Sequence, residues 1–128
     1  GKVPDQLALA LKFTAFAIKD IKKKVKGKIV LEHTGHHMGA VLAELCALNN
    51  PKQPARAVTF QTLGSKPIIK ASPELIAKCP IYSFNVASGS SALKERSIGH
   101  LYCFSKKRSS MKEFITYVQK EDKVVKII

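Results

Sequence analysis

The hydrophobic positions at the start of the chain follow helical spacing. Apolar or small side chains recur at steps of three and four residues, at Leu7, Leu11, Thr14, Ile18, Ile21 and Val25. Pro4 and Asp5 suit a first helical turn, and Gly27 is of the type at which helices end. The pattern predicts an amphipathic helix over residues 5–26, and the lysines of its last turns complement the negative end of the helix dipole.

A short apolar segment and a small-residue segment come next. The sequence KIVLEH at 28–33 is apolar and β-branched, which is typical of a buried parallel strand. The chain then turns through residues 34–38 and enters a helix predicted over 39–49. The Asn-Asn-Pro sequence at 49–51 ends that helix.

The rest of the chain alternates in the same way. Strands are predicted near 55–61, 80–87 and 100–105. Ser72 followed by proline and glutamate predicts a short helix that runs to about Lys78. Ser110 and Glu113 form a capping-box pattern for a helix over 110–120, and the tail KVVKII is either a last strand or a frayed helical end.

Alternating helices and strands predict one α/β domain over residues 1–128, a layered and mostly parallel sheet with flanking helices. The length of 128 residues fits one hydrophobic core. No apolar run is long enough for a transmembrane segment, and the first residues lack the plan of a signal peptide, so we expect a soluble protein. Cys46, Cys79 and Cys103 show no metal-ligand spacing and are expected to be small buried hydrophobes without disulfides.

Charge is the most unusual bulk property of the chain. There are 22 Lys and Arg against 9 Asp and Glu, a formal net charge of +13. The predicted binding surface consists of two basic clusters, Lys22, Lys23, Lys24, Lys26 and Lys28 in one and Lys106, Lys107 and Arg108 in the other. Such an excess favours an acidic partner, which is a protein surface, an anionic lipid or a nucleic acid. A solvated cationic surface without a partner is the simpler alternative.

The segment HTGHHMGAVLAEL at 33–45 has the outline of a nucleophile elbow, the sharp strand-to-helix turn that presents a catalytic serine. Small residues are needed there because the helix packs close to the strand, and Gly35, Gly39, Ala40 and Ala43 supply them. KIVLEHTGHHMGAVLAELCAL followed by ARAVTFQTLGS resembles the core of the lipase-like α/β-hydrolases of the fungal triacylglycerol-lipase type. The specific part of the resemblance covers residues 28–65 and implies a truncated α/β-hydrolase-like fold.

The resemblance also implies that serine chemistry is lost. Gly35, His36 and Gly39 match the motif of the family, whereas His37 stands at the position of the serine and Met38 at that of a leucine whose N–H serves the oxyanion hole. The alkoxide that would form an acyl-enzyme is therefore absent. We expect His36 to pack against the sheet and His37 to fill a vestigial pocket.

The other members of a triad are weak candidates. The loop expected at 87–100 offers only Glu95 and His100, and Glu95 stands between two basic residues. The strand that carries the oxyanion hole in longer relatives has no counterpart before residue 28. Ser65 and the serines at 88–91 lack a base at fixed spacing and suit turns.

Histidine chemistry supplies two further hypotheses. Glu32, His33, His36 and His37 are metal-ligand types, but alternation along a strand points them apart, so neither a metal nor another cofactor is expected. A nucleophilic histidine would need an orienting carboxylate, and Glu32 is the only one nearby.

The sequence thus favours a non-catalytic lipase-like domain, a pseudo-hydrolase, that acts by binding through a basic surface. An active lipid or ester hydrolase with an atypical site, a nucleic-acid-binding module and a fragment of a larger hydrolase are the alternatives. The missing strand also predicts homo-oligomers formed through an exposed sheet edge. A secreted accessory protein fits this combination, although no residue specifies the compartment.

Overall fold

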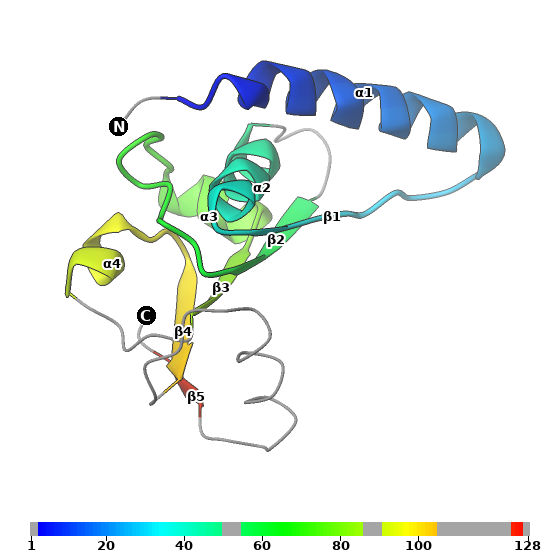
Figure 1. The fold of residues 1–128 in the computed structure, drawn as a ribbon. Coiled ribbons are helices and arrows are strands. Elements are labelled where there is room, and N and C mark those ends of the chain that lie inside the picture. The colour runs from blue at the N-terminus through cyan, green and yellow to red at the C-terminus, as the bar shows by residue number, and fades with distance from the viewer. Residues whose placement is uncertain (1–2, 50–54, 86–90, 105–123, 127–128) are drawn as a thin grey trace.

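The computed structural model describes residues 3–49, 55–85, 91–104 and 124–126 of the chain. Its elements are, in chain order, α1 (Gln6–Lys24), β1 (Leu31–His36), α2 (Met38–Leu48), β2 (Ala55–Phe60), α3 (Pro73–Lys78), β3 (Ile81–Asn85), α4 (Ser91–Arg96), β4 (His100–Phe104) and β5 (Val124–Lys126). Figure 1 shows the helices around a twisted sheet. The alternation confirms the α/β class and the mostly parallel sheet that the sequence predicts.

Strand order in the sheet follows chain order, β1-β2-β3-β4-β5. The first four strands run parallel, and β5 joins β4 antiparallel. Because β1 to β4 point the same way, their carboxyl ends meet at one edge of the sheet, where α/β proteins commonly bind ligands. The residue after β1, the residue after β2 and the last residue of β3 therefore lie in one row, as His37, Gln61 and Asn85.

One face of the sheet is packed against α2. Ala57 and Ile81, neighbours in the register of β2 and β3, are fully buried there beside Ala47 of α2. Further members of this core are Leu48, Ala55, Cys79 and Ile98, with Leu31, Ile69, Ala71, Leu75 and Ile76 packed around them. Small side chains on the strands let the helix approach the sheet closely.

The other face of the sheet carries aromatic rings. Phe84 stacks on Phe60 and on Tyr102, with ring centroids 6.0 and 5.0 Å apart. Tyr82 stacks on His100 with centroids 5.0 Å apart. These cross-strand pairs stabilise the parallel register of β2, β3 and β4.

α1 ends earlier than the sequence predicts. The helix stops at Lys24 because Val25 adopts an extended conformation (φ −129°, ψ 132°) while its N–H still bonds to the Ile21 carbonyl. Gly27, the predicted stop, lies beyond this end with φ +113°. Figure 1 shows α1 alongside α2, with its last turns extending past the sheet, which explains why Ile21 and Val25 are exposed.

β1 begins and ends later than the predicted strand at 28–33. Its six residues pair with β2 from Leu31 beside Ala55 to His36 beside Phe60. The expected buried strand is also wrong, because β1 alternates half-buried and exposed positions. The exposed positions of β1 lie on the sheet face opposite the α2 core, where Glu32 stands beside Arg56 of β2 and its carboxylate accepts a hydrogen bond from that side chain.

Most other boundaries fall close to the sequence-based ones. The Ser72 hydroxyl accepts a hydrogen bond from the Leu75 N–H at 3.1 Å, which confirms the predicted cap of α3. The expected loop at 87–100 is wrong in its middle, since residues 91–96 form α4, a run of good helix formers. The tail contains strand β5, whereas the predicted helix 110–120 lies outside the described residues.

The three cysteines are free and buried, as predicted. Burial raises the pKa of each of these thiols, which keeps them in the unreactive thiol form. Among the helices that the structure describes, none combines the length and apolar character needed to traverse a bilayer.

Candidate functional site at the strand-to-helix turn

A single residue, His37, makes the turn from β1 into α2. Its backbone has φ 56° and ψ −115°, a conformation that residues with a Cβ rarely adopt. The His37 N–H donates to the Phe60 carbonyl at 3.0 Å, and the His37 carbonyl accepts from the Ala40 N–H at 3.1 Å. The last bond of the strand and the first bond of the helix therefore meet at one strained residue, which makes the strand-to-helix turn sharp.

The turn is tight because Gly35 touches the start of α2. A Cβ atom at Gly35 would lie nearer than 3.0 Å to the backbone of Gly39 and Ala40. A Cβ atom at Gly39 would meet nothing within 4 Å. The expectation that both glycines serve close packing holds for Gly35 and is wrong for Gly39, whose Cβ direction points into open space.

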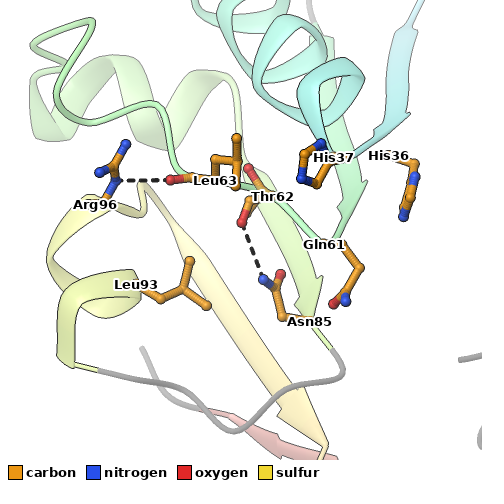
Figure 2. A pocket seen from close by; sticks show the side chains of 8 residues that line it. All are labelled: His36, His37, Gln61, Thr62, Leu63, Asn85, Leu93 and Arg96. Atoms are coloured by element: carbon orange, nitrogen blue, oxygen red, sulfur yellow. Dashed lines mark hydrogen bonds between the residues drawn. The ribbon is translucent and has the colours of Figure 1, made fainter. Parts of the chain in front are cut away.

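A pocket of about 540 Å³ opens beside this turn, at the carboxyl ends of the parallel strands. Its walls come from the β1–α2 turn, the end of β3, the loop after β2 and helix α4. The lining residues are His36, His37, Gln61, Thr62, Leu63, Asn85, Leu93 and Arg96. Figure 2 shows the α4 residues on one side of this pocket and the two histidines on the other.

Two hydrogen bonds fix the walls of the pocket. Arg96 donates through Nε to the Leu63 carbonyl at 3.1 Å, which ties α4 to the loop after β2. Asn85 donates through Nδ2 to the Thr62 carbonyl at 3.3 Å (Figure 2). The Asn85 side chain is only 6% exposed, and its Oδ1 has no hydrogen-bond partner among the described residues. A buried acceptor without a partner is available to a ligand donor.

The described lining of the pocket lacks the groups of a catalytic triad. None of its described lining residues is Asp or Glu, so no carboxylate orients the His37 imidazole from the pocket wall. Glu95 is exposed on α4 and does not line the pocket. His100 begins β4, at the opposite end of the strands from His37, and its ring stacks on Tyr82.

The residues on either side of His37 in this turn are more exposed than expected. His36 does not pack against the sheet, because it falls on the exposed positions of β1. Its ring lies 6.2 Å from the ring of His37 between centroids. Met38 is the first residue of α2 and is 56% exposed, so its side chain adds little to the core. Met38 is in the first turn of α2, and the N–H groups of a first helical turn have no acceptor within that helix.

A buried carboxylate stands behind the pocket. Glu44 of α2 is 1% exposed. It accepts hydrogen bonds from the hydroxyls of Thr59 and Ser65, each at 2.9 Å. Thr59 in turn lies 3.1 Å from the Ser83 hydroxyl, which extends the network across β2 to β3.

Burial raises the pKa of Glu44, and hydrogen bonds from Thr62, Ser65 and Thr59 oppose that rise. The Thr62 hydroxyl also accepts the Gly64 N–H at 3.1 Å. These bonds hold the loop after β2 against α2, so Glu44 positions the pocket wall without entering the pocket. The Ser65 hydroxyl donates its hydrogen bond to Glu44 and is fully buried, so it is not available as a substitute nucleophile.

The first basic cluster is solvent-exposed. Lys22, Lys23 and Lys24 form the last turn of α1, and Lys26 and Lys28 follow in the segment before β1. Among the described residues only Lys24 of these five forms an ion pair, with Asp20 at 3.0 Å. We call these five lysines the basic end of α1. Lys106, Lys107 and Arg108 of the second cluster lie outside the described residues.

Within the described part of the chain, no group of three or more His, Cys, Asp or Glu side chains is placed to hold a metal ion. His33 lies half-buried in β1, while His36 and His37 line the pocket. The His33 Nε2 is buried and has no partner among the described residues, and burial lowers the pKa of His33 below its ordinary value of 6.5. Burial therefore disfavours the charged form of the His33 imidazole in the folded protein.

Sequence reasoning missed Gln61, Asn85 and Arg96 as pocket residues. A usable signal exists for Gln61, which ends a predicted parallel strand next to where a ligand would bind, whereas Asn85 lies two residues before the end predicted for its strand. The sequence contains no comparable signal for Arg96, which reaches the pocket from a helix in an expected loop. No protein-family model matches the chain, and neither does any curated protein or solved structure.

Proposed function

We propose that this chain is a non-catalytic lipase-like domain, a pseudo-hydrolase with a truncated α/β-hydrolase-like fold, that acts by binding an acidic partner through the basic end of α1. The order β1-α2-β2 and the strained turn at His37 support a lipase-like ancestry. The tight contact of Gly35 with α2 supports it as well.

One observation supports the proposal that the domain is non-catalytic. The elbow carries the His37 imidazole, and the described residues that line the pocket include no carboxylate. Acyl transfer needs a nucleophile, a base and an acid in a hydrogen-bonded chain. His37 brings one ring, and the described lining residues supply polar groups that recognise a ligand but no acid to orient that ring.

The binding half rests on the exposed lysines. Four of the five residues of the basic end of α1 have no ion-pair partner among the described residues, since only Lys24 pairs with an acid. With a formal charge of +13 on 128 residues, the surrounding field attracts polyanions over several ångströms of solvent.

Ester turnover tests the non-catalytic half. Purified wild type, His37→Ser and His37→Ala are assayed on p-nitrophenyl esters of short and long chain and on phospholipids. We expect no turnover above buffer by the wild type. Turnover that His37→Ala abolishes would overturn the proposal and favour an active hydrolase, and activity gained by His37→Ser would mean that a triad-like partner survives.

Retention on a heparin matrix tests the binding half. The variant Lys22→Gln/Lys23→Gln/Lys26→Gln/Lys28→Gln is compared with Lys66→Gln/Lys70→Gln/Lys78→Gln/Lys94→Gln, which loses the same charge from exposed positions elsewhere. We expect the first variant to elute at clearly lower salt than the second. Equal elution of the two would show that net charge alone is responsible and would overturn the assignment to α1.

Self-association through β1 is a second candidate interaction. In the described sheet β1 stands at the end of the strand order, and an unpaired edge invites another strand. Light scattering coupled to size exclusion tests it: Thr34→Pro, on the exposed side of β1, removes one donor and is expected to shift a dimer to monomer.

A further inference from the structure

The solvent side of α1 is apolar where a surface helix should be polar. Leu9, Phe13 and Phe16 are spaced by four and three residues and share one face of the helix. Their exposed fractions are 69%, 72% and 69%. Large apolar side chains gathered in this way on a surface mark an interaction site.

The opposite side of α1 already supplies the contact with the domain. Leu7, Leu11 and Ile18 recur at helical spacing on the side that is partly or fully buried, and α1 contacts α2. Attachment of the helix to the domain therefore does not explain why Phe13 and Phe16 are present on the exposed side of α1. Figure 1 shows α1 at the periphery, along one side of the molecule.

Lysines border the apolar side of α1. Lys12 lies one turn from Leu9 and from Phe16, and Lys19 lies one turn after Phe16. Asp20, the only acid within α1, is occupied by Lys24. Beyond the helix the basic end continues through Lys26 and Lys28, next to Val25 and Val30, which are 56% and 64% exposed.

We infer that α1 is an interfacial helix that docks the domain on an anionic lipid surface. Leu9, Phe13 and Phe16 enter the boundary between headgroups and acyl chains, and the lysines meet the lipid phosphates. The inference rests on the proposed function for the role of the basic end, and it names the partner. We call Leu9, Phe13 and Phe16 the apolar stripe.

Charge and apolarity together favour a lipid surface over other acidic partners. A nucleic acid would neutralise the lysines but would leave Leu9 and both rings in water. A second copy would cover the apolar stripe, but it would bring another +13 of charge and a second row of lysines against the first. An anionic bilayer would both bury the apolar stripe at the acyl-chain boundary and neutralise the lysines with lipid phosphates.

Vesicle co-sedimentation tests the docking. Wild type is mixed with vesicles of phosphatidylcholine alone or of equal parts phosphatidylcholine and phosphatidylserine, beside Phe13→Ser/Phe16→Ser and the two lysine variants defined above. We expect binding only to the anionic vesicles. Loss of the rings should weaken it by at least about tenfold, and loss of the lysines at the basic end by about as much. The variant with lysines changed elsewhere should bind much more tightly than the variant of the basic end.

Tryptophan fluorescence tests insertion directly, because the chain contains no Trp. Phe13→Trp places a reporter on the apolar stripe, and Leu63→Trp places one at the pocket, 39% exposed in the wild type. We expect a blue shift on anionic vesicles for Phe13→Trp and none for Leu63→Trp. Retained folding of each variant is checked by circular dichroism.

The outcomes separate this inference from the proposed function. Retention on heparin without vesicle binding would overturn the inference and leave the proposed function in place. Vesicle binding that the Phe13→Ser/Phe16→Ser variant retains in full, with no blue shift for Phe13→Trp, would overturn insertion of the apolar stripe. A protein that binds neither matrix nor vesicle would overturn both.

Discussion

Gly35 on β1 lies against the backbone of Gly39 on α2 so closely that no Cβ fits at Gly35. The contact decides how near the helix comes to the strand, and with it where His37 points. A Cβ atom has no room at Gly35 but meets nothing at Gly39, so substitutions at these two glycines form a matched pair for experiment.

Replacement of Gly35 by alanine should be severely destabilising. The new methyl would overlap backbone atoms that have no room to move, so we expect a loss of about 3 kcal/mol or more in the free energy of unfolding. Gly39→Ala adds a methyl in open space within a helix and should be neutral or stabilising by up to about 1 kcal/mol. Urea unfolding of both variants measures the difference, and similar values for the two would contradict the packing described above.

The strained backbone of His37 predicts a gain on replacement by glycine. Glycine adopts φ 56° without a Cβ penalty, so His37→Gly should leave stability unchanged or raise it by about 1 kcal/mol. His36→Gly, one residue earlier in β1, is the control and should cost about 0.5–1 kcal/mol. Thermal unfolding of the pair tests this, and a large loss for His37→Gly would show that the imidazole itself stabilises the fold.

The raised pKa of Glu44 predicts how the stability of the fold depends on pH. Its pKa is raised in the fold, so the native state binds the proton more tightly than the unfolded state does. The contribution of Glu44 to the free energy of unfolding therefore falls as pH rises above 4.5, the ordinary value, and levels off once the native carboxyl has ionised. Glu44→Gln should remove this fall, as followed by urea unfolding across a pH series.

Removal of the acceptor oxygens of Glu44 should lower the free energy of unfolding more than removal of its charge alone. Glu44→Leu leaves buried hydroxyls of Thr59 and Ser65 without their acceptor and should cost about 2 kcal/mol or more. Glu44→Gln keeps one acceptor oxygen and should cost less. A Glu44→Leu variant as stable as Glu44→Gln would mean that the hydroxyls find other partners.

His33 predicts a loss of stability on the acid side. Its pKa is lowered by burial, so the unfolded chain takes up the proton first as pH falls below 6.5. The free energy of unfolding should therefore decrease from that pH downward until the native imidazole is protonated as well. His33→Leu removes the titrating ring, and its unfolding curves should be less sensitive to pH in this range. An unchanged slope would assign the acid sensitivity to other groups.

Local patterns predicted much of the fold. The small-residue run gave α2 within a residue of its observed limits, and the Ser72 cap and the buried cysteines followed from side-chain chemistry alone. These features depend on neighbours in the chain, which is why a single sequence reports them.

Other features depended on contacts between segments distant in sequence. The limits of β1 follow from its pairing with β2, not from its own apolar residues, and pairing carried the strand through His36. The sequence by itself determined that a glycine-flanked turn centred on histidine follows a strand, and that lysines end the first helix. Only the tertiary structure decided that His37 takes a positive φ, that Asn85 and Arg96 share its pocket, and that Phe13 and Phe16 face solvent. The physical reason is that exposure and pocket composition arise from packing between elements, whereas residue patterns encode only each element's own periodicity.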